Sequence, residues 1–237
     1  MTDLPERIKS TDWQSVTDSM HKNGYAILSN LLSDHECDQL ISGYSQPEHY
    51  RKTVIMARHR FGLGEYKYFN YPLPELLHTL RTQIYPHLAP IANAWFKALH
   101  IDTSFPLEHQ VFLQQCHANN QKKATVLILK YGEGGFNTLH QDLYGNLYFP
   151  IQIVLMLSEP EKDFTGGEFV LTQQIPRAQS KATVLKPKKG DILIFTTNFK
   201  PEKGTKGYYR VNMKHGVSEV KTGNRYALGI IFHDAEN

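Results

Sequence analysis

The sequence predicts a mostly β fold, a sandwich or barrel with N-terminal helices (α+β). In the first third of the chain, apolar residues recur at helical spacing, whereas from about residue 110 they fall in short segments rich in β-branched and aromatic residues. Glycine- and proline-containing turn signals separate these segments. No internal repeat or linker interrupts the pattern. We therefore expect a single domain over residues 1–237, with 1–109 as mainly helical support and 110–237 as the β core.

Two helices are predicted in the N-terminal part. The first lies in "SDHECDQLISGY", where Ser33 is a suitable N-cap and Glu36, three residues on, completes a capping box. The second begins after Pro74 and continues to about residue 100, because apolar residues recur every three or four positions. Within it, Pro86 and Pro90 are expected to break or kink the helix, since proline removes a backbone donor.

The strands of the β core are predicted from short apolar runs bounded by turns. Glycines mark the turns near 132–135, 166–167, 190 and 204–207. The predicted strand segments are "ATVLILKY", "YFPIQIVLMLS", "GEFVLTQ", "ATVLKP", "GDILIFTT", "YYRVNMKHGVSEV" and "RYALGIIFHD".

The composition excludes several classes of protein. Of the 237 residues, 41% are hydrophobic and 21% charged, which is ordinary for a globular chain. No apolar run approaches the ~20 residues that span a bilayer, and the polar N-terminus lacks the features of a signal peptide. Cys37 and Cys116 cannot form a disulfide framework, so we expect reduced thiols, a cytoplasmic location and no membrane partner. A net charge of +3 is weak support for a polyanionic partner. The oligomeric state is left open.

Two His-x-Asp pairs are candidate metal ligands: His100 with Asp102, and His140 with Asp142. Residues two apart project from the same face of a strand, whereas on a helix they lie about 200° apart. His100 closes the predicted second helix and a loop follows, so turn chemistry explains that pair. His140 follows a predicted strand and the turn "GEGG" at the edge of the β core. The second pair is therefore favoured.

A third ligand is expected from a distant strand, and His215 in "RVNMKHGVSEV" is the candidate. Two imidazoles and one carboxylate form the facial triad of non-haem Fe(II) oxygenases, which leaves positions for a chelating cosubstrate and dioxygen. Arg225 follows ten positions later, at the start of the last predicted strand. Two interpretations stay open for it: an exposed edge residue, or a buried cation that needs an anionic partner such as the far carboxylate of a dicarboxylic acid.

The ordered set of motifs resembles the 2-oxoglutarate- and Fe(II)-dependent dioxygenases, especially the prolyl-hydroxylase-like branch. It consists of the His140 pair, "TGGEFVL", "VLKPKKGDILIF", His215 and Arg225. More narrowly, "RHRFGLGEYKYFNYPLP", "LHQDLYG", "DFTGGEFVL" and "GIIFHD" resemble a bacterial family labelled as oxygenases acting on damaged nucleic acid. The resemblance extends along nearly the whole chain.

This resemblance implies a double-stranded β-helix (jelly roll) as the catalytic core. It implies Fe(II) held by the catalytic residues His140, Asp142 and His215, with 2-oxoglutarate and O2 as cosubstrates. Arg225 would anchor the distal carboxylate of 2-oxoglutarate, and Tyr131 would help to hold this cosubstrate. The implied reaction hydroxylates a C–H bond while 2-oxoglutarate is oxidised to succinate and carbon dioxide; at an N-methyl group, hydroxylation releases formaldehyde.

The segment "RKTVIMARHRFGLGEYKYFNY" is the candidate substrate lid. Positive charge beside aromatic faces is how flipped or single-stranded bases are held, which makes Arg58, Arg60, Tyr66 and Tyr68 candidate substrate residues. The alternative for these residues is packing of the helical layer. A nucleobase is one possible substrate, and a protein or peptide side chain or a small metabolite are the others. A cupin-like metal-binding protein or a non-catalytic binding protein is the remaining alternative.

Overall fold

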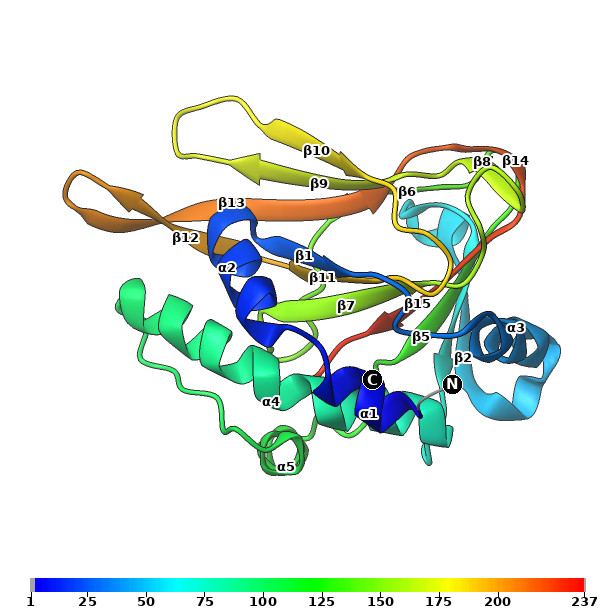
Figure 1. Ribbon diagram of the computed structural model, residues 1–237, viewed down its shortest axis with the longest axis horizontal. Helices are drawn as coiled ribbons and strands as arrows, with labels where there is room; N and C mark the ends of the chain where they lie inside the picture. Colours follow the sequence, from blue (N-terminus) through cyan, green and yellow to red (C-terminus); the bar gives the residue numbers. More distant parts are fainter. Residues whose placement is uncertain (1–2, 237) are drawn as a thin grey trace.

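Two large antiparallel sheets face each other in the computed structural model, which describes residues 3–236 (Figure 1). The first sheet has seven strands, in the order β1 (Tyr25–Leu28), β11 (Ile192–Thr196), β7 (Ile151–Met156), β15 (Arg225–Ile230), β5 (Leu127–Tyr131), β4 (Glu65–Phe69), β2 (Tyr50–Ile55). The second has six: β10 (Lys181–Leu185), β9 (Phe169–Gln174), β13 (Gly207–Val217), β6 (Phe136–His140), β3 (Gly62–Leu63), and β12 (Phe199–Gly204), which pairs with β13. A short pair joins β14 (Val220–Gly223) to β8 (Phe164–Gly166).

Helices cover the face of the first sheet that points away from the second sheet (Figure 1). They are α1 (Leu4–Lys9), α2 (Trp13–Asn23), α4 (Glu75–Ala98) and α5 (His109–Ala118). In α3 (Asp34–Ser42), Cys37 Sγ lies 3.9 Å from the Met156 carbonyl oxygen at the end of β7. Three 3-10 turns complete the chain: η1 (Gly43–Ser45), η2 (Pro47–His49) and η3 (Met56–His59). This arrangement confirms the predicted fold class, mostly β with a few helices. None of the described helices is both long and apolar enough to cross a membrane.

The central strands of the first sheet are buried on both faces, which explains their continuous apolar runs. On β7, Ile151, Ile153 and Leu155 pack on the helices, whereas Val154 faces the second sheet. Gln152 also points toward the second sheet and is a lone polar residue in this strand. The side chains between the two sheets therefore form an inner layer, in which a polar residue is conspicuous.

The predicted helices are present, and α3 begins with the capping box formed by Ser33 and Glu36. Of the break or kink expected at Pro86 and Pro90, the break is absent, because α4 continues through both prolines. Each proline removes one helical hydrogen bond, but the buried face of α4 packs along the sheet and offsets that loss. Residues 3–109 also contain four strands. Of these, β1, β2 and β4 belong to the first sheet and β3 belongs to the second.

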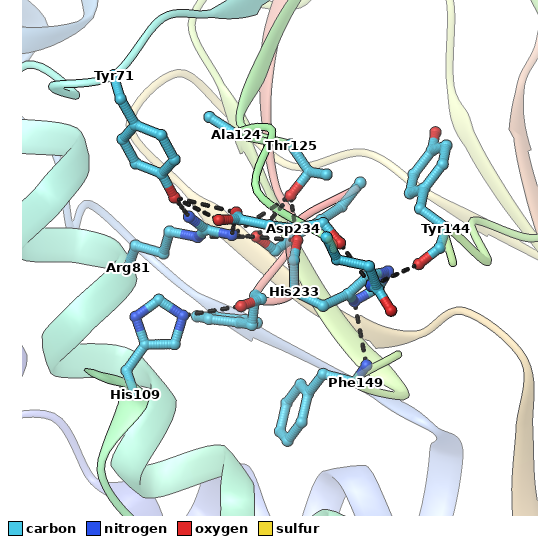
Figure 2. A network of polar contacts seen from close by, with 12 residues as sticks. Tyr71, Arg81, His109, Ala124, Thr125, Tyr144, Phe149, His233 and Asp234 are labelled. Carbon is cyan, nitrogen blue, oxygen red and sulfur yellow. Dashed lines mark hydrogen bonds and ion pairs between the residues drawn. The ribbon is translucent and has the colours of Figure 1, made fainter. Parts of the chain in front are cut away.

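A buried polar network lies between α4 and the segment that follows β15 (Figure 2). Arg81 and Asp234 have side chains 1% and 0% exposed, and Arg81 Nη2 lies 2.8 Å from Asp234 Oδ1. The Tyr71 hydroxyl lies 3.0 Å from both carboxylate oxygens, and His117 Nε2 is 2.9 Å from Oδ2. Asp234 is therefore fully paired, as a buried charge must be.

Two buried histidines beside this network should make the fold sensitive to acid. Burial, reinforced by the charge of Arg81, lowers the pKa of both His109 and His233 to about 3. Histidine in an unfolded chain has a pKa of about 6.5, so below that pH the unfolded chain binds more protons than the folded one. The free energy of unfolding should fall as the pH falls from about 6.5 toward 3, by about 1.4 kcal/mol per pH unit for each of the two groups.

Urea unfolding between about pH 7 and pH 5 measures this loss. His109→Gln keeps a donor for the Phe232 carbonyl oxygen, which His109 Nε2 contacts at 2.8 Å. This variant should show a shallower pH dependence than the wild type, whereas replacement of the exposed His35 by Gln should leave it unchanged. Equal pH dependence in His109→Gln and in the wild type would contradict the assignment.

Candidate active site

His140, Asp142 and His215 meet at one point between the two sheets. One ligand atom from each side chain lies within 4.8 Å of the other two. His215 Nε2 is 3.3 Å from Asp142 Oδ2, and His140 Nε2 is 3.6 Å from Asp142 Oδ1. The two histidines are register partners on the neighbouring strands β6 and β13, with ring centroids 4.2 Å apart. Strand pairing therefore fixes the two imidazoles side by side.

The segment after β6 turns the carboxylate of Asp142 toward the two imidazoles. The Asp142 backbone N–H donates to Thr197 Oγ1 at 2.8 Å. The Gln141 side-chain amide donates to the carbonyl oxygens of Asn198 and Met213, at 2.9 and 2.8 Å. These hydrogen bonds of Gln141 and Asp142 fix the conformation of the segment that carries the carboxylate.

Asp142 is held in its ionised form. Burial by itself would raise the pKa of this carboxyl, but the hydrogen bond and charge of His215 and the charge of His140 hold it well below its usual value. The Tyr144 hydroxyl donates to Oδ1 at 3.0 Å, and Gln152 Nε2 donates to Oδ2 at 2.9 Å. Burial raises the pKa of Tyr144, so its hydroxyl keeps its proton and remains a donor.

Both imidazoles present Nε2 to the carboxylate. His140 Nδ1 lies 2.7 Å from the Thr138 carbonyl oxygen, so Nδ1 carries the proton and the Nε2 lone pair is free for a metal. His215 is only 6% exposed, and burial together with the charge of His140 lowers its pKa. Phe169 stacks on its ring at a centroid distance of 5.8 Å. In their neutral form, two imidazoles together with one carboxylate are a donor set that suits Fe(II).

Arg225 is buried beside this site without a charged partner among residues 3–236. It is 1% exposed, and its Nε and Nη2 atoms have no hydrogen-bond acceptor among the described residues. Burial lowers the pKa of Arg225 to about 10. Of the two interpretations left open by the sequence, the buried cation is therefore the observed one.

Tyr131 accompanies Arg225 because the two are register partners on β5 and β15. The Arg225 guanidinium lies 5.5 Å from the centroid of the Tyr131 ring. Gly167 makes room on the other side: it has a φ of +61°, and a Cβ there would lie 2.9 Å from Arg225 Cδ. The Tyr131 hydroxyl is buried, which raises its pKa to about 12.

A cavity of about 250 Å³ connects the triad with Arg225 and Tyr131. Apolar side chains from the inner faces of both sheets form most of its wall, among them Leu127, Leu129, Val154 and Val217. The unpaired guanidinium and the three donor side chains thus face one small, largely apolar space. Such a cavity suits a short dicarboxylate that reaches from a metal to a cation.

The other candidate residues lie in different places. Tyr66 lines the cavity, whereas Tyr68 is buried and its hydroxyl donates to that of Tyr144 at 3.2 Å. Arg58 and Arg60 are exposed at η3 and just after it, outside the cavity wall. His100, of the disfavoured pair, lies in the turn after α4 with a φ of 55°. These residues do not converge on one point.

Three contributors to the site did not emerge from the sequence: Tyr144, Gln152 and Thr197. The signal for Gln152 is its place as the lone polar residue in the apolar run "FPIQIVLML". Tyr144 is two residues beyond Asp142, and its role depends on a loop conformation that no periodicity predicts. Thr197 Oγ1 accepts a hydrogen bond from the backbone N–H of Asp142, which is 55 residues away in the chain.

Replacing Tyr144 by phenylalanine should weaken metal binding without unfolding the protein. Loss of an outer hydrogen bond to a metal ligand typically lowers affinity by about 10–100-fold. Titration with Fe(II) under anaerobic conditions measures the effect. Tyr208→Phe is the control, since Tyr208 is 52% exposed on β13 and does not line the cavity. Equal affinity in the two variants would show that the Tyr144 hydroxyl does not tune the carboxylate.

Comparison with known proteins shows which family the sequence matches and which solved structures share its fold. A family model described as "Oxygenase, catalysing oxidative methylation of damaged DNA" matches residues 64–235. An uncharacterised protein of Mycobacterium tuberculosis strain H37Rv is 44% identical over 167 residues, which are 70% of this chain and 72% of that protein. The same values hold for an uncharacterised protein of strain CDC 1551.

Three solved structures share the fold at low sequence identity. A prolyl-4-hydroxylase from Pseudomonas putida has a TM-score of 0.53 and 13% identity, covering 92% of this chain and 96% of that chain. An oxidoreductase of the 2OG-Fe(II) oxygenase family from Burkholderia pseudomallei has a TM-score of 0.53 and 16% identity, covering 96% and 95%. A Trichoplax adhaerens prolyl hydroxylase, in complex with a peptide fragment of the hypoxia inducible factor oxygen degradation domain, has a TM-score of 0.53 and 14% identity, covering 96% and 90%. These similarities confirm the jelly-roll core.

Proposed function

This chain belongs to the oxygenase family described as acting on damaged DNA, and from that premise we propose that His140, Asp142 and His215 hold Fe(II) while Arg225 binds 2-oxoglutarate. The oxygenase family and the fold shared with a 2OG-Fe(II) oxygenase support dependence on Fe(II) and 2-oxoglutarate in this proposal. The observation that carries the assignment of roles is the unpaired guanidinium of Arg225, which faces the same cavity as the triad. A buried arginine without a partner is costly, and a carboxylate of the cosubstrate removes that cost.

Each residue has a defined task in this proposal. When bound, the metal with 2-oxoglutarate and O2 supplies the oxidation of a C–H bond to an alcohol, coupled to the formation of succinate and carbon dioxide. Arg225 would hold the far carboxylate through its unpaired Nε and Nη2 atoms, and the Tyr131 hydroxyl would donate to the same end. Gln152 and Tyr144 hold the orientation of Asp142. The apolar cavity wall excludes water from the reacting carbon.

A methylated nucleobase is the prime substrate that we propose, with methyl hydroxylation followed by release of formaldehyde. Beyond the family description, the edge of the cavity supports it. Phe61 lines the cavity, is 45% exposed, and stacks with His59 at a centroid distance of 5.3 Å. Its carbonyl oxygen accepts from the Thr138 N–H at 2.9 Å, which fixes the segment. A fixed aromatic face flanked by Arg58 and Arg60 suits stacking on a base.

A side chain of a protein is the second candidate substrate. Leu143, which is 43% exposed, also lines the cavity and adds to its apolar character. An apolar edge also suits a peptide, and a small metabolite is the third class to be tested.

Succinate formation is the experiment that tests the function. We expect slow succinate production from Fe(II), 2-oxoglutarate and O2 alone, its loss on addition of a chelator, and stimulation by methylated single-stranded oligonucleotides. Methylated peptides and free metabolites form the comparison panel. If the protein neither forms succinate nor binds 2-oxoglutarate, the dioxygenase assignment is refuted. If only peptides stimulate succinate formation, the proposal of a nucleobase as the substrate is refuted.

A further inference from the structure

Resting on the proposed function, we infer that a basic patch beside the active site binds the phosphate backbone of a single-stranded or locally unpaired nucleic acid. The patch consists of Arg51, Lys52, Lys122 and Lys123, which line one hollow together with Asn70, Tyr71 and Ala124. Among residues 3–236, no acidic residue lines this hollow. The two parts of the patch come from β2 and from the segment after α5, 70 residues apart in the chain, so the fold brings the cations together.

The charges of the patch are not neutralised by the protein. Within residues 3–236, none of the four cations forms an ion pair with a carboxylate. Asp234 lies close enough to affect Arg51, but its oxygens already pair with Arg81, Tyr71 and His117 (Figure 2). Concentrated unpaired positive charge on a concave surface attracts a polyanion.

Arg51 is built into the patch and is not a freely moving surface side chain. Its Nε donates to the Ala124 carbonyl oxygen at 2.9 Å, and its guanidinium lies 4.5 Å from the centroid of the Tyr68 ring. Burial lowers the pKa of Arg51 without removing its charge at neutral pH. A guanidinium fixed in this way can bind a phosphate oxygen with little loss of side-chain entropy.

Direct contacts connect the patch to the proposed iron ligands. Tyr68, under the guanidinium of Arg51, donates to the Tyr144 hydroxyl at 3.2 Å, and Tyr144 donates to Asp142 at 3.0 Å. Gln121 precedes the two lysines, and its amide donates to the carbonyl oxygens of Tyr144 and Asp234, at 3.2 and 2.7 Å. The patch is therefore held in a fixed position relative to the cavity.

One segment of the chain carries both part of the patch and the exposed aromatic pair. Lys52 is in β2, η3 follows that strand and ends at His59, and His59 stacks with Phe61. At about 3.3 Å per residue on a strand and about 2 Å in a 3-10 turn, the chain between Lys52 and Phe61 spans at most roughly 25 Å. A base that enters the cavity between them must leave its stack, which favours an unpaired strand.

Binding of a fluorescent oligothymidylate, measured by anisotropy at several salt concentrations, tests the inference. The patch variant is Lys52→Ser, Lys122→Ser, Lys123→Ser. The matched control, Lys9→Ser, Lys97→Ser, Lys162→Ser, removes the same charge from exposed positions outside the patch. We expect the control to bind like the wild type. The patch variant should bind about tenfold more weakly or worse, with a salt slope smaller by about 2, since each phosphate contact on a single strand contributes about 0.7.

Thermal melting of both triple variants shows that they are folded. Equal binding by the patch variant and the control would overturn the inference, and so would tighter binding of the wild type to polyglutamate than to the oligonucleotide. If the wild-type protein forms succinate but does not bind oligothymidylate, the inference about the patch is overturned and the proposed dioxygenase activity stands. Patch-dependent binding without succinate formation or 2-oxoglutarate binding would overturn the proposed chemistry and support the patch.

Discussion

Asp142→Ala is expected to abolish Fe(II) binding and all succinate formation while the protein stays folded. The carboxylate is the only anionic donor in the triad, and two neutral imidazoles do not replace its charge. We expect a loss of metal affinity larger than the roughly 10–100-fold that follows removal of an outer hydrogen bond. The side chain is 14% exposed at the cavity and lies outside the apolar clusters of the core, so the cost in stability should be small.

The second His-x-Asp pair offers the control for this variant. Asp102 has the same His-x-Asp spacing but lies in the loop after α4, so Asp102→Ala should bind Fe(II) like the wild type. Anaerobic Fe(II) titration and thermal melting of the two variants give the comparison. If Asp142→Ala still binds Fe(II), or if both variants lose binding equally, the proposed role of Asp142 as a metal ligand is contradicted.

Arg225→Ala is expected to raise the KM for 2-oxoglutarate by about 30-fold to several thousand-fold, with little change in Fe(II) affinity. Truncating one member of a buried, hydrogen-bonded charge pair costs about 2–5 kcal/mol, which corresponds to this range. Arg225→Lys should recover part of the loss because it keeps the charge, although it cannot form the bidentate fork. Equal loss of iron and 2-oxoglutarate binding would instead indicate that Arg225 is structural.

The stability of the ligand-free protein distinguishes a binding role of Arg225 from a structural role without a measurement of activity. At neutral pH the folded protein carries a buried guanidinium without an anionic partner among residues 3–236, which opposes folding. Arg225→Met fills similar space without the charge, so its melting temperature should equal or exceed that of the wild type. Only the wild type should then be stabilised by added 2-oxoglutarate. A large destabilisation in Arg225→Met would argue against a binding role.

Much of this arrangement follows from local patterns in the sequence. The capping box at Ser33 depends on residues three apart, and the strands of the β core depend on apolar runs between glycine turns. The spacing of His140 and Asp142 indicated a shared face on a strand, but β6 ends at His140, and the segment after it is what directs Asp142 toward the imidazoles. His215 and Arg225 were placed by the order of motifs, and pairing with His140 and Tyr131 now explains their positions.

Other features depend on partners far along the chain and escape such patterns. The strand β1 is four residues long, and its place at the edge of the first sheet depends on pairing with β11. The helix α4 continues through Pro86 and Pro90 because of what its buried face contacts. The basic patch likewise combines two short segments, each of which alone resembles an ordinary exposed surface.

The buried pair of Arg81 and Asp234 also bears on the order in which the chain can mature on a ribosome. Arg81 is synthesised 153 residues before the carboxylate that neutralises it. Until Asp234 emerges, closing α4 onto the first sheet would bury an uncompensated cation, so this helix should remain loosely attached during synthesis. Nascent chains that stop short of residue 234 should therefore be cleaved by proteases in the α4 region, and chains that extend past it should resist.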